Sequence, residues 1–300
     1  MMINKGNGTF VQDKQDVFQK LGLITDAKFT DINADGWPDL IVVGEWMPIS
    51  ILINREGVFE NQTEKYGLNN SHGLWNSLWV EDLNEDGKMD MIIGNHGTNT
   101  FLEPKMKLYL NDFDQNGSKE QILCIERNGK YYPIVDKDEL ITQLPSLKKK
   151  MVYYSDYAQK DISQILDPTL VEQSLQLQLN TLETKLLLGT DKGFEKYNLP
   201  QEIQYSPVYA LRVIASEKTK EKSLYLGGNQ YLVKPQFGRY DASRGWHLPI
   251  ILTGDSLSLG HITSLNIKGQ IRNIVPLKQN QTKRLIFAIN DDEVQFYDDL

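Results

Sequence analysis

The sequence is poor in the residues that most often carry catalysis, redox chemistry or transition-metal binding. It contains one cysteine, Cys124, which excludes an internal disulfide and lies in the apolar run "QILCI" that predicts a packed thiol. No second histidine or cysteine lies at metal-ligand spacing, and no G-x-S-x-G, H-E-x-x-H or P-loop motif occurs. We therefore expect no catalytic role for the four histidines, which are His72, His96, His247 and His261.

Long apolar runs and dense positive charge are also scarce. The best membrane candidate, "LIVVGEWMPISILI", is interrupted by Glu45 and Pro48, so we expect no membrane insertion. The net charge is −8 and the only dense basic run is Lys148–Lys150, which argues against a nucleic-acid partner. The lysines are typical of a solvated helix end, with anion binding as the alternative. The start, "MMINKGNGTF", has no signal-peptide features, so the chain is expected to be cytoplasmic or a piece of a longer exported protein.

An acidic motif of the form D-x-[DN]-x-[DN]-G-x-x-[DE] occurs three times. Its copies are "DINADGWPD" (31–39), "DLNEDGKMD" (82–90) and "DFDQNGSKE" (112–120). Carboxylates this close repel one another unless a cation or a dense set of hydrogen bonds holds them. The repetition therefore indicates three sites of one kind.

The segments around each motif predict strands rather than helices. Short aliphatic runs, such as "LIVVGEW" and "MIIGNHG", follow the motifs, and "AKFTDI" and "NSLWVEDL" precede them. An EF-hand would need a bidentate glutamate at its twelfth position and flanking helices. The twelfth positions here are Val42, Ile93 and Leu123. We therefore interpret each motif as the loop of a β-hairpin.

Further hairpins are predicted without the acidic loop. "PVYALRVIAS" with "KSLYLGGNQ" forms one, in which Ala215, Glu217, Thr219 and Ser223 replace the acidic positions, and "QIRNIVPLK" with "RLIFAIND" forms another. Between about 136 and 182 the apolar spacing becomes helical, with Asp136 and Ser155 as candidate N-caps. We expect a helical insertion within one domain that spans 1–300. One of Trp75 and Trp79 is expected to pack between repeats.

With these motifs, the chain resembles the FG-GAP or VCBS repeat proteins, whose blades form the calcium-loaded β-propeller of integrin α subunits. It is similar in particular to VCBS repeat proteins of Bacteroidota in "DINADGWPDLIVVGEWMP", "NDFDQNGSKEQIL", "DELITQLPSLKKK" and "GRYDASRG". The resemblance covers nearly the whole chain. It implies an all-β propeller of four-stranded blades, an extracytoplasmic location at the cell surface or in the periplasm, and bound calcium.

The resemblance also implies a ligand set for three calcium ions, in which each loop contributes four side chains and one backbone carbonyl. The ligands would be Asp31, Asn33, Asp35, Asp39 and the Trp37 carbonyl; Asp82, Asn84, Asp86, Asp90 and the Lys88 carbonyl; and Asp112, Asp114, Asn116, Glu120 and the Ser118 carbonyl. No calcium is expected at the hairpin of Ala215.

The chemistry of the motifs agrees with calcium. Hard oxygen ligands without histidine or cysteine favour Ca²⁺ or Mg²⁺, and a flexible shell of mixed oxygens favours Ca²⁺. Gly36, Gly87 and Gly117 lie where each loop reverses, a position that commonly needs a positive φ. The alternative is a turn rich in Asp and Asn that binds no metal.

A propeller must close its ring, because open sheet edges invite aggregation. The start of the chain is similar to an outermost strand, and its end, "IRNIVPLK", "RLIFAIN" and "VQFYDDL", predicts three strands without a fourth. We expect Gly8–Gln12 to complete the last blade of a ring of about five blades. The alternative is that the chain is a fragment of a longer propeller.

Three function classes fit these observations. The first is a non-enzymatic, calcium-stabilised scaffold that binds a protein or glycan partner, with no nucleic acid and no membrane insertion. The second is an extracellular carbohydrate-active enzyme, such as a polysaccharide lyase, on the same scaffold, and the third is a calcium-responsive switch. In "QFGRYDASRGWH", Arg239, Tyr240, Asp241, Arg244 and Trp246 fit either a polar pocket or a structural pair of Arg239 with Asp241.

Overall fold

A computed structural model describes residues 1–216, 221–253, 256–279 and 282–298. The chain was expected to form one domain with a helical insertion. Its contacts divide it into two compact units, one made of residues 1–101 and 182–300 and the other of residues 102–181. Among the described residues, no helix is long and apolar enough to cross a membrane.

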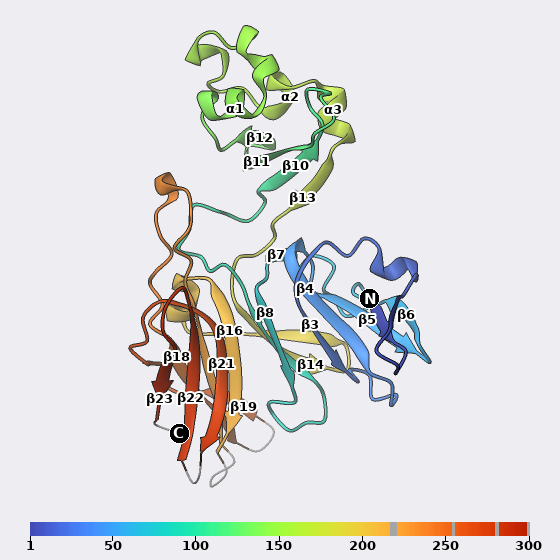
Figure 1. The fold of residues 1–300 in the computed structure, drawn as a ribbon, viewed down its shortest axis with the longest axis vertical. Coiled ribbons are helices and arrows are strands. Elements are labelled where there is room, and N and C mark those ends of the chain that lie inside the picture. The colour runs from blue at the N-terminus through green and yellow to red at the C-terminus, as the bar shows by residue number, and fades with distance from the viewer. Residues whose placement is uncertain (217–220, 254–255, 280–281, 299–300) are drawn as a thin grey trace. The chain divides into compact units, whose positions relative to one another are not determined.

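Among its described residues, the first unit contains four antiparallel sheets of three or more strands, called A to D here in chain order (Figure 1). Sheet A contains β3 (Leu23–Thr30), β4 (Asp39–Met47), β5 (Ser50–Arg55) and β6 (Val58–Asn61), with β7 (Gly73–Leu74) on β4. Sheet B contains β8 (Ser77–Glu81), β9 (Asp90–Gly94), β14 (Lys185–Thr190) and β15 (Gly193–Tyr197). Sheet C contains β16 (Val208–Ala215), β17 (Lys222–Gly228), β18 (Trp246–Thr253) and β19 (Ser256–Leu259), with β20 (Thr263–Ser264) on β18. Sheet D contains β21 (Gln270–Gln279), β22 (Thr282–Asn290) and β23 (Gln295–Tyr297).

Neighbouring sheets pack face to face because their strands alternate apolar side chains between two faces. Ile41 and Ile51 of sheet A meet Met91 and Ile93 of sheet B, and the fully buried Trp75 lies in the same cluster, so the expected packing of one tryptophan between repeats is confirmed. A second core joins sheets B and C, and a third joins sheets C and D. The first strands of successive sheets, β3, β8, β16 and β21, lie next to one another in that order.

The N-terminal segment does not complete the last sheet, so that prediction is wrong. β2 (Phe10–Gln12) pairs with β1 (Met2–Asn4) in a separate two-stranded hairpin, and sheet D has three described strands. No pairing among the described strands joins sheet D to sheet A or closes a barrel. The residues after the hairpin instead cover sheet A, where Val17 and Phe18 pack on Leu40 and Leu52.

The second unit has a sheet of its own with helices packed against it (Figure 1). The strand order is β12 (Lys130–Pro133), β11 (Glu120–Arg127), β10 (Lys107–Asn111) and β13 (Leu175–Gln178). The helices are α1 (Lys137–Gln143), α2 (Ile162–Ile165) and α3 (Pro168–Gln173). The predicted N-cap Asp136 accepts a hydrogen bond from the Glu139 N–H, whereas the predicted N-cap Ser155 is wrong, because it lies inside the short turn Tyr154–Asp156. Residues 175–178, which the sequence placed in the helical insertion, form a strand. Cys124 is buried in this core as predicted, and burial raises the pKa of its thiol.

Candidate metal sites

Each acidic motif closes a β-hairpin, as the sequence predicted. The last strand pair before the loop is Thr30 with Asp39 between β3 and β4, and Glu81 with Asp90 between β8 and β9. The third is Asn111 with Glu120 between β10 and β11 of the second unit. The motif therefore has the same register in three different sheets.

The first aspartate of every loop holds the backbone of the turn. Asp31 accepts hydrogen bonds from the N–H groups of Asp35 (3.0 Å) and Gly36 (2.8 Å). The same two bonds recur at 3.2 and 2.8 Å in the second loop, from Asp86 and Gly87 to Asp82, and at 2.9 and 2.9 Å in the third, from Asn116 and Gly117 to Asp112. The three loops therefore share one hydrogen-bond pattern.

The turn needs two residues with positive φ, and the sequence indicated one of them. The predicted glycine has φ of 88° at Gly36, and the equivalent Gly87 and Gly117 have 84° and 91°. The residue two positions earlier is also left-handed, with φ of 57° at Ala34, 63° at Glu85 and 58° at Gln115. Side-chain identity gave no signal for this second position, because none of these residues is glycine or asparagine.

The ninth position places a carboxylate inside the protein. Asp39 and Asp90 are fully buried, and each accepts the N–H of the second loop residue, Ile32 (3.0 Å) or Leu83 (2.8 Å). Their other oxygens accept an N–H from the adjacent strand, from Asn54 at 2.7 Å and from Gly189 at 2.8 Å. In the third loop Glu120, which is also buried, accepts the N–H of Phe113 at 2.8 Å.

In the first two loops, burial and neighbouring carboxylates disfavour the ionised form of the buried aspartate. Burial raises the pKa of Asp39 and of Asp90, backbone hydrogen bonds lower it, and the remaining loop aspartates raise it further. A cation among these oxygens would favour the ionised carboxylates.

The third loop brings three carboxylates together most closely. Oxygens of Asp112, Asp114 and Glu120 all lie within 4.8 Å of one another. Ligand oxygens on opposite sides of a Ca²⁺ ion at 2.3–2.6 Å lie about 5 Å apart, so this spacing fits a single calcium ion. In the first loop the Asn33 amide donates to the Asp35 carboxylate at 2.9 Å.

The fifth and seventh loop positions are joined by a further repeated contact. The backbone N–H groups of Trp37, Lys88 and Ser118 donate to Asp35, Asp86 and Asn116 at 2.8, 2.8 and 2.7 Å. The carbonyls of the three donor residues, expected as ligands, stay a prediction. The Lys88 ammonium also pairs with Asp191 at 3.1 Å.

The predicted fourth hairpin is confirmed by the pairing of β16 with β17. Ser223 replaces the buried carboxylate, and its hydroxyl lies 3.0 Å from Nε2 of His247. Lys222 next to it is buried, donates to the Asp82 carbonyl of the second loop and lies 3.3 Å from Glu81. Glu217 and Thr219 lie outside the described residues. The contact of Lys222 with another hairpin's loop had no signal in the sequence.

The side chains of the stretch "QFGRYDASRGWH" contact different neighbours. Arg239 stacks on Tyr231 at 3.8 Å, and its side chain lies 3.9 Å from Asp241. Tyr240 is buried, contacts the Thr100 hydroxyl at 2.8 Å and packs edge-on against His96. Burial lowers the pKa of His96 to about 4. The side chains therefore have structural contacts at this end of the first unit.

A cleft of about 570 Å³ lies between the first two acidic loops, and no sequence pattern predicted it. Asp31 and Asn33 line one side of it, and Asp86 lines another. The rings of Tyr66 and Phe194, whose centres are 5.9 Å apart, also line it. Charged residues of both signs lie there too, namely Lys65, Lys88, Asp191 and Lys192.

Residues 31–93 match the family model described as FG-GAP-like repeat. The match begins at the first acidic loop, contains the second, and ends within β9. No match to the chain is found among curated proteins.

Proposed function

We propose that this chain is a non-catalytic scaffold of the β-propeller type, stabilised by calcium, that binds a protein or glycan partner outside the cytoplasm. The observation that carries the proposal is that three acidic loops at the same hairpin register share the hydrogen bonds made by their first aspartate. The FG-GAP-like match supports the propeller, as does the adjacency of the first strands of successive sheets.

Calcium would be held by side chains at the first, third, fifth and ninth positions of each loop. These are Asp31, Asn33, Asp35 and Asp39; Asp82, Asn84, Asp86 and Asp90; and Asp112, Asp114, Asn116 and Glu120. The ion would supply positive charge where burial and neighbouring carboxylates raise the pKa of Asp39 and Asp90. Because those two residues also hold an adjacent strand, an ion at the loop would stabilise the sheet beyond its hairpin.

The binding role follows from the exposed loops and from the cleft between two of them. A scaffold that positions loops on rigid sheets is a common arrangement for recognition. The cleft combines acidic loop residues and lysines with an aromatic pair, which suits a partner with both polar and apolar groups.

The calcium part of this proposal is tested by thermal unfolding of the full chain. We expect the melting temperature to rise with Ca²⁺, to fall with EDTA, and to respond less to Mg²⁺ at equal concentration. Isothermal titration calorimetry should give three calcium ions per chain. An unchanged melting temperature in EDTA and no heat of binding would refute the metal assignment, and altered partner binding by a protein that melts unchanged would favour a calcium switch.

A further inference from the structure

Residues 148–154 of the second unit form a surface segment in which every side chain except that of Met151 is exposed, and it carries both positive charge and apolar surface. We call it the basic-aromatic segment. Lys148–Lys150 are exposed, and within the described part of the chain none of their ammonium groups lies in an ion pair. Val152, Tyr153 and Tyr154 are 63%, 70% and 60% exposed. Large apolar side chains grouped on a surface commonly mark an interaction site.

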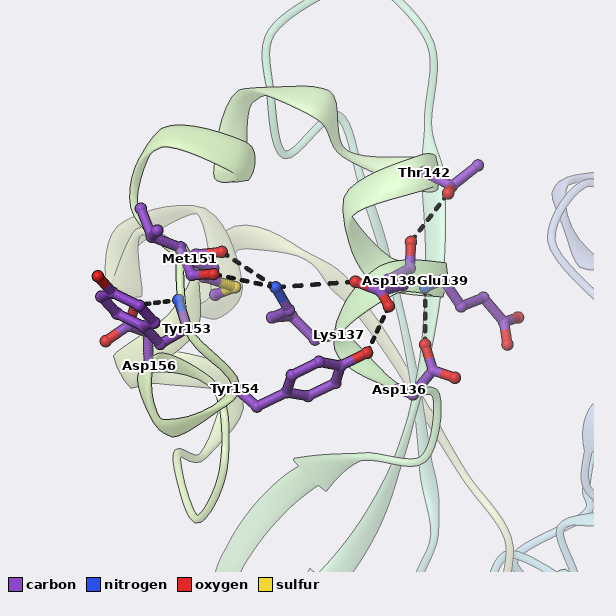
Figure 2. Close-up of polar contacts among 10 residues, drawn as sticks. Asp136, Lys137, Asp138, Glu139, Thr142, Met151, Tyr153, Tyr154 and Asp156 are labelled. Carbon is purple, nitrogen blue, oxygen red and sulfur yellow. Dashed lines mark hydrogen bonds and ion pairs between the residues drawn. The ribbon is translucent and has the colours of Figure 1, made fainter.

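The backbone of this segment is held in place from beneath. Leu147 and Met151 are buried in the core of the unit on either side of the lysines. From α1, the Lys137 ammonium lies 3.4 Å from the carbonyl oxygens of Met151 and Val152 and 4.7 Å from the centre of the Tyr154 ring (Figure 2). The exposed side chains are therefore displayed from an ordered backbone, which lowers the entropic cost of binding.

The acidic groups near the segment already have partners. Asp138 accepts a hydrogen bond from the Tyr154 hydroxyl and lies 3.7 Å from the Lys137 ammonium (Figure 2). Asp156 accepts the N–H of Tyr153, and Asp136 caps α1. Asp136 and Asp156 accept only backbone N–H groups and keep their negative charge, whereas Asp138 is offset by Lys137. Because the ammonium groups of Lys148, Lys149 and Lys150 lie in no ion pair among the described residues, their three charges favour a partner with negative charge.

We infer that the basic-aromatic segment is a docking surface for an acidic polysaccharide. A sugar ring presents C–H groups on its face, which lie against an aromatic ring, while its hydroxyl and carboxylate groups reach the lysines. Nucleic acid is disfavoured by the overall charge. A membrane is disfavoured because lipid-binding clusters commonly have about four to eight basic residues and a larger apolar face. The inference rests on the proposed binding role and names the partner class and the residues.

The test measures binding of the full chain to polygalacturonate, a carboxylated polysaccharide, with neutral dextran as the comparison. We expect wild-type protein to bind polygalacturonate but not dextran, and we expect this binding to weaken at high salt. The variant K148Q/K149Q/K150Q should bind about 10- to 100-fold more weakly, since each exposed ionic contact contributes up to a factor of several. V152S/Y153S, which leaves the Tyr154 contacts intact, should also lose about 10-fold.

The matched control removes three exposed lysines elsewhere. K5Q/K14Q/K20Q changes the net charge by the same amount in the first unit and should bind as wild type does. Equal weakening in both triple variants, or no binding by wild type, would overturn the inference. Binding of poly-glutamate or of anionic vesicles in place of polygalacturonate would overturn the choice of partner. The calcium-dependent melting temperature of the same samples separates failure of the docking surface from failure of the calcium proposal. Protein whose melting temperature rises with calcium but which does not bind polygalacturonate refutes only the docking surface.

Discussion

Removal of the Asp90 carboxylate tests whether the acidic loops stabilise the sheets that they join. Asp90 is fully buried and accepts the N–H groups of Leu83 and Gly189, both at 2.8 Å. In D90A both donors lose their acceptor, at a cost of about 1–3 kcal/mol each. Burial raises the pKa of Asp90, so loss of a desolvated carboxylate offsets part of that sum. We expect the free energy of unfolding to fall by about 2–4 kcal/mol without calcium.

Calcium should enlarge this difference. An ion at 100 times its dissociation constant adds about 2.7 kcal/mol to the wild-type protein, and the variant should lose that gain at the second loop. The assay is urea unfolding followed by circular dichroism, in EDTA and in saturating Ca²⁺. E85Q is the matched control, because Glu85 lies in the same loop with an exposed side chain outside the proposed ligand set. A D90A effect below about 1 kcal/mol in EDTA would refute the hydrogen-bond reasoning, and equal effects in both buffers would refute Asp90 as a ligand.

Three further predictions concern the first unit. G87A should cost about 1–2 kcal/mol through backbone strain alone, because φ is 84° and a Cβ would meet no atom within 4 Å; a thermal melt in which G87N costs as much as G87A would contradict this cause. K222M should lower the free energy of unfolding in urea by about 1–3 kcal/mol, because the Asp82 carbonyl and Glu81 lose the ammonium; a neutral effect would show that this buried contact contributes nothing. Burial lowers the pKa of His96 to about 4, so the unfolded chain binds a proton between about pH 6.5 and 4 that the folded chain does not. The free energy of unfolding should therefore fall as the pH is lowered from about 6.5 to 4, by on the order of 3 kcal/mol more in wild type than in H96Q. Urea unfolding at several pH values measures this difference.

The hairpins and their loops were predictable because they depend on local sequence. The acidic motif, its glycine and its two flanking strands lie within a short stretch, and the structure confirms the three hairpins, whose second strands begin at Asp39, Asp90 and Glu120. The left-handed residue two positions before the glycine was missed, since Ala34 and Glu85 have no preference for that conformation. The turn imposes it through the paired N–H bonds to the first aspartate.

Features that depend on distant contacts were predicted less well. The expected closure at Gly8–Gln12 assumed a partner at the other end of the chain, whereas β2 pairs with the nearby β1. β13 was missed because its alternating "LQLQ" is only four residues long and follows a helical stretch, while its partner β10 lies far back in the sequence. Lys222 of sheet C contacts the Asp82 carbonyl in the loop of sheet B, and no local sequence pattern indicates this contact.

The place of the second unit in the sequence explains how it can be inserted without disturbing the first unit's sheets. β9 and β14 are neighbours in sheet B although the whole second unit lies between them in sequence. The segments that lead into and out of the second unit are hydrogen-bonded to each other within the first unit. The Gly97 N–H donates to the Leu182 carbonyl at 2.8 Å, and the Asn95 N–H donates to the Thr184 hydroxyl at 3.1 Å. Because the ends already meet, the length of the insertion adds only a slowly growing closure entropy. The inserted unit has its own core, its own acidic loop and an exposed basic-aromatic segment, so its surface can change while the register of sheet B does not.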